Sequence, residues 1–353
     1  MSASDADWGS APAPTNAPLS APELAAYLAR IGLAPAPAAA AAVLPSATTA
    51  AALREVVRAH AFSVPFESLD VTLRAHISLA PRDIFEKLVA RRRGGFCLET
   101  SLLLRSALQA LGFELRLRLA RVWMRTPAEA YAPREPPIPR LHLVLIVRAD
   151  GGDEYLVDVG FGGGGPPEPL PLRPSGGGTA SGGDSGGASS GSANGGDSGG
   201  ASGGEVNGGV GAAAAFRIDA GDAALGEDSF VVFGVQGGAW RRLYSFEHVS
   251  WDCPRVHAAD FLPVSLYVQA GRGTLFHTMR VATRPLPDGG RLTLLGRELR
   301  RREGAERLGA APALEVSAVA DAAEYRRLAA EHFGIELSEE QAQRVFDADA
   351  PPQ

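Results

Sequence analysis

RRRGGFCLETSLLL, residues 91–104, is the stretch that decides the fold. A Gly-Gly pair interrupts the chain there, and apolar residues then dominate as far as Leu111, which is followed by Gly112. A helix that is apolar on nearly all sides belongs inside a core, and glycine is the usual residue just past a helix C-terminus. The sequence therefore predicts a buried helix from Cys97 to Leu111, with the cysteine in its first turn.

Helices are expected before this stretch and strands after it. Apolar residues recur at helical spacing in 24–31 and 53–61, and Pro81 begins a further helix. After Gly112, short apolar or alternating segments bounded by Gly, Pro or Asp are typical of strands. These segments are 114–124, 141–147, 154–159, 230–233, 241–246, 275–281 and 291–299, and amphipathic helices follow at 324–335 and 338–346. This order favours an α+β protein of three parts.

Two tracts lack a periodic apolar pattern. Residues 1–22 are mostly Ala, Pro, Ser and Asp, and residues 175–211 are nearly all Gly, Ser, Ala, Asn and Asp. Such compositions bury too little apolar surface to offset the entropy of ordering. We expect a disordered leader, a helical domain at 23–112, a strand-rich domain at 113–250 that contains the flexible insertion, and a mixed domain at 251–353.

The composition argues against several classes of partner. The chain has 40 acidic and 34 basic side chains and a formal charge of −6, without the basic stripe that binds nucleic acid. Its first residues do not resemble a signal peptide, and no stretch reaches the ~18 apolar residues of a membrane span. We expect a cytoplasmic protein that binds neither nucleic acid nor membrane.

Cysteine and histidine usage does not indicate a metal site. Cys97 and Cys253 are the only cysteines, too few for a disulfide scaffold. The spacing of Cys253 with His248, His257 and His277 fits no familiar ligand pattern. We therefore expect no metal, and at least one thiol that is free to react.

A catalytic use of Cys97 is suggested by its position. A thiol at a helix N-terminus lies near the positive end of the helix dipole, which favours the nucleophilic thiolate. The alternative is that Cys97 is a small buried hydrophobic residue. A thiolate nucleophile needs a base, and the base needs an orienting acceptor.

The segment LHLVLIVRADGGDEYLVDVGFG, residues 141–162, offers both partners on one predicted hairpin. A loop with an odd number of residues, such as 149–151, places His142 directly opposite Asp158 on the same face, whereas an even loop separates them. An aspartate buried in an apolar strand is costly unless it is paired. Taken singly, His142 also fits a core histidine and Asp158 a strand-end residue; together with Cys97 they predict a catalytic triad.

RGGFCLE, PRLH and VDVGFG, in this order, resemble the three signature segments of the arylamine N-acetyltransferases. AYLARIGL, VPFESL and HFGI extend the resemblance over most of the chain. It implies an N-terminal helical bundle that carries Cys97, a central antiparallel β-barrel that carries His142 and Asp158, and a C-terminal α/β lid. The three side chains would form a Cys-His-Asp arrangement like that of the cysteine proteases.

The resemblance also implies a ping-pong reaction with acetyl-CoA as co-substrate and no metal. The acetyl group would move from Cys97 to an arylamine, arylhydrazine or N-hydroxyarylamine, and the backbone N–H of Cys97 would join an oxyanion hole. By the same resemblance Phe161, Phe66 and Gly162 belong to the acceptor pocket, although ordinary core packing also explains the two phenylalanines. Arg30 and Glu67 would form a structural ion pair.

Two segments depart from the pattern of the family. Ser101 stands where an asparagine is usual, and in AADFLPVSLYVQ only Ser265 matches the segment expected beside the CoA cleft. Ser265 is therefore the candidate for binding the co-substrate. An amide synthase that joins a polyketide acid to an aromatic amine, or a non-catalytic relative that binds aromatic ligands, remain alternatives, and the sequence leaves the oligomeric state open.

Overall fold

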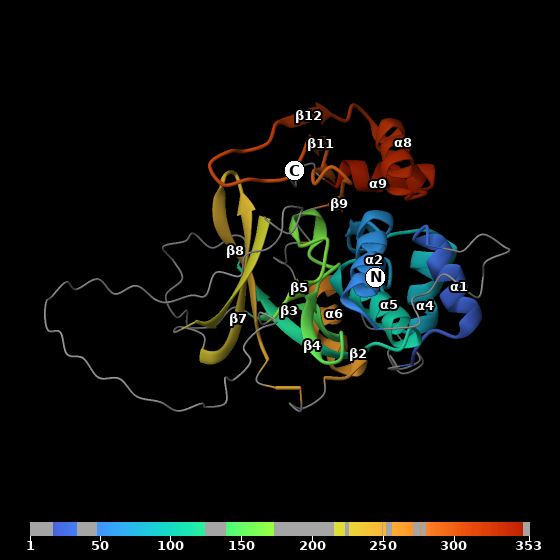
Figure 1. The fold of residues 1–353 in the computed structure, drawn as a ribbon. Helices are drawn as coiled ribbons and strands as arrows, with labels where there is room; N and C mark the ends of the chain where they lie inside the picture. Colours follow the sequence, from blue (N-terminus) through green and yellow to red (C-terminus); the bar gives the residue numbers. More distant parts are fainter. Residues whose placement is uncertain are drawn as a thin grey trace, which may run out of the picture.

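The computed structural model describes residues 17–33, 48–123, 139–172, 215–222, 226–248, 250–251, 256–270, 276 and 280–348. The predicted insertion at 175–211, residues 1–16 of the predicted leader, Cys253 and His277 lie outside these ranges. In Figure 1 the N-terminal helices lie beside a curved sheet, and residues 281–347 lie across one end of both.

The N-terminal part is helical, as predicted. Its elements are α1 (Ala21–Arg30), α2 (Ala50–Ser63), α3 (Leu69–Leu73), α4 (Pro81–Phe85), the π-helix η1 (Glu86–Ala90) and α5 (Cys97–Ala110). The helix α1 already begins inside the segment 1–22, and the N–H of Leu19 donates to the carbonyl of Ser106 at 3.1 Å. The central helix α5 is buried on nearly all sides and ends before Gly112, whose φ of 89° glycine adopts without strain.

The central sheet is antiparallel throughout, in the order β5-β4-β3-β2-β8-β7-β6. Its strands are β2 (Glu114–Val122), β3 (Arg140–Ala149), β4 (Asp153–Val157), β5 (Leu170–Pro171), β6 (Phe216–Asp222), β7 (Gly226–Gln236) and β8 (Ala239–Glu247). The sheet curves like a barrel, but its outer strands β5 and β6 do not pair within the described ranges, so the predicted antiparallel β-barrel is only nearly closed. The short β5 ends at Pro171, which has no N–H to donate to a further strand.

The hairpin of β3 and β4 decides where His142 and Asp158 point. Its loop is Asp150–Gly152, with Leu145 opposite Val157 and Ala149 opposite Asp153. The loop has three residues, which is the odd case of the two that the sequence left open, and the pairing is shifted by two residues from the one expected for a loop at 149–151. His142 and Asp158 therefore share a face while lying diagonally rather than directly opposite each other.

The C-terminal part contains η5 (Ala258–Phe261), α6 (Leu262–Ala270), β9 (Val281–Pro285), β10 (Arg291–Leu295), β11 (Glu298–Arg302), β12 (Leu314–Ala318), α8 (Ala322–Phe333) and α9 (Glu339–Asp347). The strand β1 (Phe66–Glu67) joins its sheet, which has the order β1-β9-β10-β11-β12. The predicted strands at 275–281 and 291–299 are both wrong in detail: Phe276 is helical, and Gly296, with a φ of 57°, turns the second segment into a hairpin.

Apolar packing ties the C-terminal part to the helices. Phe261 and Val268 belong to the same buried cluster as residues of α1, α2 and α5. A second cluster joins α3 to β9, β10, α8 and α9. Within the described ranges, no helix combines the length and the hydropathy that crossing a bilayer requires.

Candidate active site

Cys97 is the first residue of α5, and its position is fixed by the residues around the helix start. Glu99 Oε2 accepts the backbone N–H of Phe96 at 3.1 Å, which caps the helix, and Lys87 Nζ donates to Glu99 Oε1 at 2.8 Å. Cys97 is only 4% exposed, and its Sγ lies 3.7 Å from the carbonyl oxygen of Leu141 on β3. The buried thiol therefore faces the central sheet.

His142 and Asp158 lie together in the interior. His142 Nε2 is 2.8 Å from Asp158 Oδ2, and Asp158 Oδ1 accepts the N–H of Gly160 at 2.9 Å. Both side chains are buried, so the aspartate has exchanged water for these two donors. Gly160 also touches the start of α5, because a Cβ added to it would stand 2.8 Å from the Cα of Cys97.

The electrostatics of His142 connect it to both neighbours. Burial alone lowers the pKa of His142, but the charge and hydrogen bond of Asp158, and then the hydrogen bond and charge of Cys97, raise it to about 10. His142 is thus hydrogen-bonded to Asp158 and electrostatically coupled to Cys97. Its imidazole is held in the charged form at neutral pH, where an unperturbed histidine is mostly neutral.

Aromatic rings surround the imidazole. The ring centroid of Phe161 is 5.3 Å from that of His142 in an edge-on arrangement, and the ring of Tyr244 lies 5.3 Å away on β8. Burial, and then the charge of Asp158, raise the pKa of Tyr244. The apolar surround keeps water from the histidine, and Tyr244 was missed by sequence reasoning although it stands in the segment LYSF, residues 243–246.

The other predicted pocket residues also gather here. Phe66 and Gly162 line a cavity of about 20 Å³ that also touches Asp158 and Thr283. A Cβ on Gly162 would be 3.5 Å from the ring of Phe66, and the φ of Gly162 is +75°. Glycine therefore lets the chain turn after Phe161 with its backbone close to the cavity.

A buried ion network supports the turn before Cys97. Arg93 contacts Glu67 at 2.5 Å and Asp70 at 2.9 Å, while Lys87 contacts Asp70 at 2.7 Å and Glu99 at 2.8 Å. Paired in this way, five charged side chains of β1, α3, η1, the turn before α5 and α5 itself are kept inside the protein. The sequence did not indicate this network.

The predicted ion pair between Arg30 and Glu67 is wrong. Arg30 donates instead to the carbonyl oxygens of Leu88 and Arg92, at 3.0 and 3.1 Å. Glu67 contacts Arg93, because the turn that follows η1 brings this nearer guanidinium beside β1. Arg30 thus fastens α1 to the main chain around η1.

The two serines of the departing segments lie on different helices. Ser101 on α5 donates to the carbonyl of Leu143 at 3.3 Å, one residue beyond His142. Ser265 on α6 is buried, and its hydroxyl accepts from Gln269 Nε2 at 2.8 Å. A role of Ser265 in binding the co-substrate stays a prediction.

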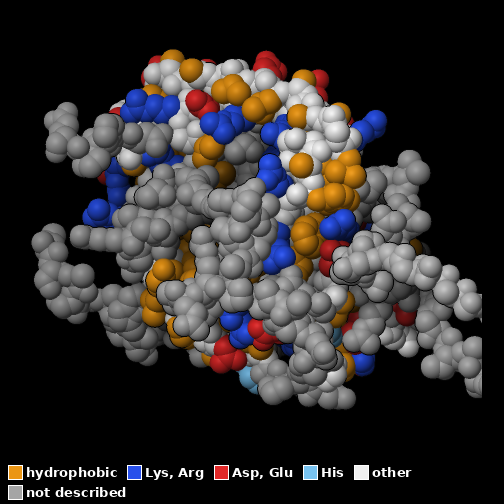
Figure 2. Space-filling view, turned by 90° about the vertical axis from the view of Figure 1, so that its left-hand side faces the viewer, with side chains coloured by type: hydrophobic (Ala, Val, Ile, Leu, Met, Phe, Trp, Pro, Cys, Tyr) orange, Lys and Arg blue, Asp and Glu red, His pale blue; other side chains and the backbone are white. Residues whose placement is uncertain are grey.

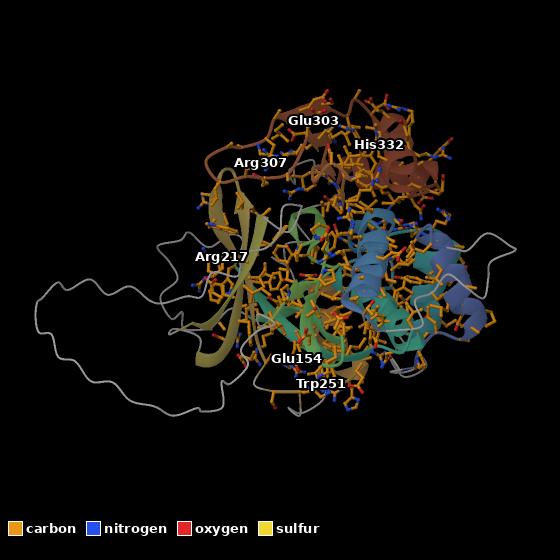
Figure 3. The ribbon with its side chains drawn as sticks, viewed as in Figure 1. Glu154, Arg217, Trp251, Glu303, Arg307 and His332 are labelled. Atoms are coloured by element: carbon orange, nitrogen blue, oxygen red, sulfur yellow. The ribbon has the colours of Figure 1, made fainter. Side chains whose placement is uncertain are left out.

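His248 lies in a charged cluster at the end of the sheet away from the C-terminal sheet. Figure 3 shows Glu154 and Trp251 there, opposite Glu303 and Arg307. His248 Nε2 is 3.0 Å from Glu154 Oε2 and its Nδ1 is 3.1 Å from Arg118 Nη2, so the fold supplies a carboxylate that the sequence spacing did not reveal. The described part of the chain contains no group of three or more His, Cys, Asp and Glu placed to hold a metal ion.

The chain is similar in sequence to proteins of known family. A family profile described as N-acetyltransferase matches residues 49–182 and 213–342. The arylamine N-acetyltransferase of Mycolicibacterium smegmatis is 43% identical over 145 residues, which is 40% of this chain and 47% of that protein. The chain thus aligns with about half the length of this curated relative.

Solved structures align over more of the chain. The structure of the M. smegmatis arylamine N-acetyltransferase is 28% identical, with a TM-score of 0.68 over 92% of this chain and 98% of that one. The arylamine N-acetyltransferase of Mycobacterium marinum, solved in complex with CoA, is 25% identical, with a TM-score of 0.68 over 92% and 99% of the two chains. On the family profile, the shared fold and the ordered segments RGGFCLE, PRLH and VDVGFG, the chain belongs to the arylamine N-acetyltransferase family.

Proposed function

We propose that this protein transfers an acetyl group from acetyl-CoA to the nitrogen of an arylamine, an arylhydrazine or an N-hydroxyarylamine, with Cys97 as the nucleophile. The contact chain of Cys97, His142 and Asp158 at the start of the buried helix carries the proposal. A thiolate beside an imidazolium that a carboxylate orients is a standard means of nucleophilic acyl transfer. CoA as the partner is supported by the relative solved in complex with it.

In the first half-reaction, the Cys97 thiolate attacks the thioester carbonyl of acetyl-CoA. The carbonyl oxygen gains the negative charge of the tetrahedral intermediate, which the N–H groups at the start of α5 are suited to stabilise. Its collapse breaks the bond to the CoA sulfur, and the His142 imidazolium gives that sulfur its proton. The products are CoA and an acetyl-Cys97 thioester.

In the second half-reaction, the amine attacks the acetyl-Cys97 carbonyl. His142, now neutral, accepts the proton that the amine nitrogen loses, and the Cys97 thiolate leaves. Asp158 holds Nε2 of the ring, so Nδ1 is the nitrogen that serves the thiolate and the amine. The apolar walls of Phe161 and Phe66 suit an aromatic acceptor and limit the access of water to the acetyl-enzyme.

The direct test of this proposal is the acetyl-enzyme itself. Incubation with acetyl-CoA and no acceptor should add one acetyl group to Cys97 by mass spectrometry and release CoA, and a later addition of aniline should remove that group. Cys97→Ala should abolish both the label and the transfer, whereas Thr100→Ala, in the same turn of α5, should keep them.

Two results would count against the proposal. Acetylation of the Cys97→Ala variant at the wild-type rate would exclude this nucleophile. A wild-type enzyme that releases no CoA with any small aromatic amine would favour the amide synthase alternative.

A further inference from the structure

A second cavity adjoins the one that touches Asp158. Its volume is about 60 Å³, and it lies between α2, the turn after β4, β7 and the β9–β11 region. Gly165, Pro167 and Pro285 line both cavities, so the two are neighbours along one cleft. The second cavity is therefore adjacent to the one that reaches Asp158 of the candidate site.

The second cavity is rich in positive charge. Arg58, Arg291 and Arg302 line it, together with a single carboxylate, that of Glu306. Arg302 forms an ion pair with Glu306, and the N–H of Gly237 donates to the same carboxylate at 3.1 Å. The carboxylate in the cavity is thus already engaged.

Arg58 also has a carboxylate partner outside the lining. It forms an ion pair with Glu168, which Arg54 contacts as well at 3.5 Å. Two cations therefore share the carboxylate of Glu168. On the face that Figure 2 displays, Lys and Arg side chains outnumber Asp and Glu in the part of the middle that grey atoms leave visible.

Arg291 is the least neutralised of these cations. Its ion-pair contact is to Glu306 at 4.0 Å, and Arg302 holds that carboxylate more closely. Burial, and then the charge of Arg302, lower the pKa of Arg291 to about 10, so its guanidinium is still charged at neutral pH. An anion bound beside Arg291 would stabilise its charged form and so oppose the lowering of its pKa by burial and by Arg302.

Two glycines make room for this guanidinium. A Cβ on Gly163 would stand 2.4 Å from Arg291 Cδ, and a Cβ on Gly164 would stand 3.0 Å from Arg291 Nη1 and 3.4 Å from Gln236 Nε2. Because neither side chain exists, the guanidinium and the carboxamide approach the same point in the cavity. N–H donors that converge from a guanidinium and an amide suit an oxyanion.

We propose that Arg291 and Gln236 form a subsite of the cleft that binds an oxyanion carried by one of the two substrates. The shared chemistry is a phosphate or carboxylate oxygen. Its source is either a phosphate of acetyl-CoA or a carboxylate on the ring of the arylamine. The choice of these two sources rests on the proposed function, whereas the anion subsite itself rests on the cavity and its cations.

The test compares charged and uncharged substrates in Arg291→Gln. Acetyl-CoA is compared with 4-nitrophenyl acetate as the donor, and 4-aminobenzoate is compared with aniline as the acceptor. The loss of a charge-assisted hydrogen bond should raise the KM for the substrate that carries the oxyanion by about 10- to 100-fold. Uncharged substrates should react as in the wild type, which also shows that the variant is folded.

Matched variants sharpen the result. Arg301→Gln removes a half-exposed arginine of β11 that pairs with Glu303 at 3.5 Å, and it should leave every KM unchanged. Arg291→Lys should recover part of the affinity. A rise for acetyl-CoA alone identifies the phosphate source, a rise for 4-aminobenzoate alone identifies the carboxylate source, and equal values for all substrates overturn the proposal.

The subsite can be tested even if the proposed function fails. If the wild type acetylates Cys97 with neither donor, pyrophosphate and benzoate are used as ligands in thermal unfolding. At least one of them should raise the Tm of the wild type and not that of Arg291→Gln. Identical behaviour of the two proteins with both anions would overturn the subsite.

Discussion

At the scale of single residues, the most informative group is His142, because its pKa reports the contacts that the mechanism needs. A pKa raised to about 10 means that the imidazolium persists to high pH. The enzyme should therefore keep its proton donor through the neutral range and lose it as the pH rises through about 10. Without Asp158 and Cys97, burial would hold the pKa of His142 below the 6.5 of an unperturbed histidine.

Replacing Asp158 with Asn should lower the pKa of His142 and slow the acetylation of Cys97 by about 10²- to 10⁴-fold, since the proton transfer loses its oriented partner. Single-turnover acetylation by 4-nitrophenyl acetate, followed across neutral and alkaline pH, measures both effects. The alkaline fall in rate should move to lower pH. Asp153→Asn, at the exposed start of β4, is the control, and an unchanged profile in Asp158→Asn would contradict the assigned role.

The sequence predicted which residues meet here but not their full surroundings. The period of two along β3 and β4 puts His142 and Asp158 on one face once the loop is odd, and the sequence had left the parity of the loop open. The shift of two residues was not predictable, because apolar residues fill both strands and mark no single register. Tyr244 comes from β8, which is paired to β2, and no local pattern connects it to the histidine.

At the scale of elements, the start of α5 depends on a buried cation. Lys87 on η1 contacts both Asp70 and Glu99, and Glu99 in turn caps the helix that presents Cys97. Burial already raises the pKa of Glu99, and the charge of Lys87 opposes that rise. Removing Lys87 leaves two buried carboxylates with less compensation.

Lys87→Met should therefore reduce the free energy of unfolding by about 3–5 kcal/mol, the usual loss when one partner of a buried pair is removed. Glu99→Gln added to this variant should restore part of the loss, because the Gln carboxamide oxygen still accepts the N–H of Phe96 without a charge. Denaturant unfolding of the single and double variants measures the coupling. A double variant less stable than Lys87→Met would refute this account.

The elements that the sequence predicted well are helices whose apolar residues recur at one clear spacing along the chain. The helices α2, α5, α8 and α9 agree with their predicted segments within a few residues. The segment 291–299 failed because both of its halves are strand-like, and only the positive φ of Gly296 separates β10 from β11. The strand β12 was missed because all of its residues are exposed at the edge of the sheet, so it has no apolar face to recognise.

At the scale of the whole molecule, the site exists only where the helices and the central sheet meet. Gly160, after β4, packs against the backbone of Cys97 at the start of α5. Because the neighbouring atoms belong to the main chain, an added methyl group would have to push the two parts of the protein away from each other. No sequence pattern predicts such a contact, since it joins residues far apart along the chain.

Gly160→Ala should cost about 1–3 kcal/mol of stability, as overpacking does, and it should slow acetylation by moving Cys97 from His142. Val159→Ala is the matched control, because it removes side-chain atoms at the neighbouring position and adds none between Gly160 and the backbone of Cys97. Calorimetry and the rate of Cys97 acetylation together decide the outcome. A Gly160→Ala enzyme that keeps the full rate would show that the contact does not set the distance between thiol and imidazole.

The burial of Cys97, which is 4% exposed, also determines which products its oxidation can give. The two sulfurs of a disulfide lie about 2.05 Å apart. The buried Cys97 thiols of two protein molecules cannot approach each other so closely. Hydrogen peroxide is small enough to enter. Oxidative inactivation at Cys97 should thus begin as a sulfenic acid that a small reductant reverses, and not as covalent dimers through this thiol.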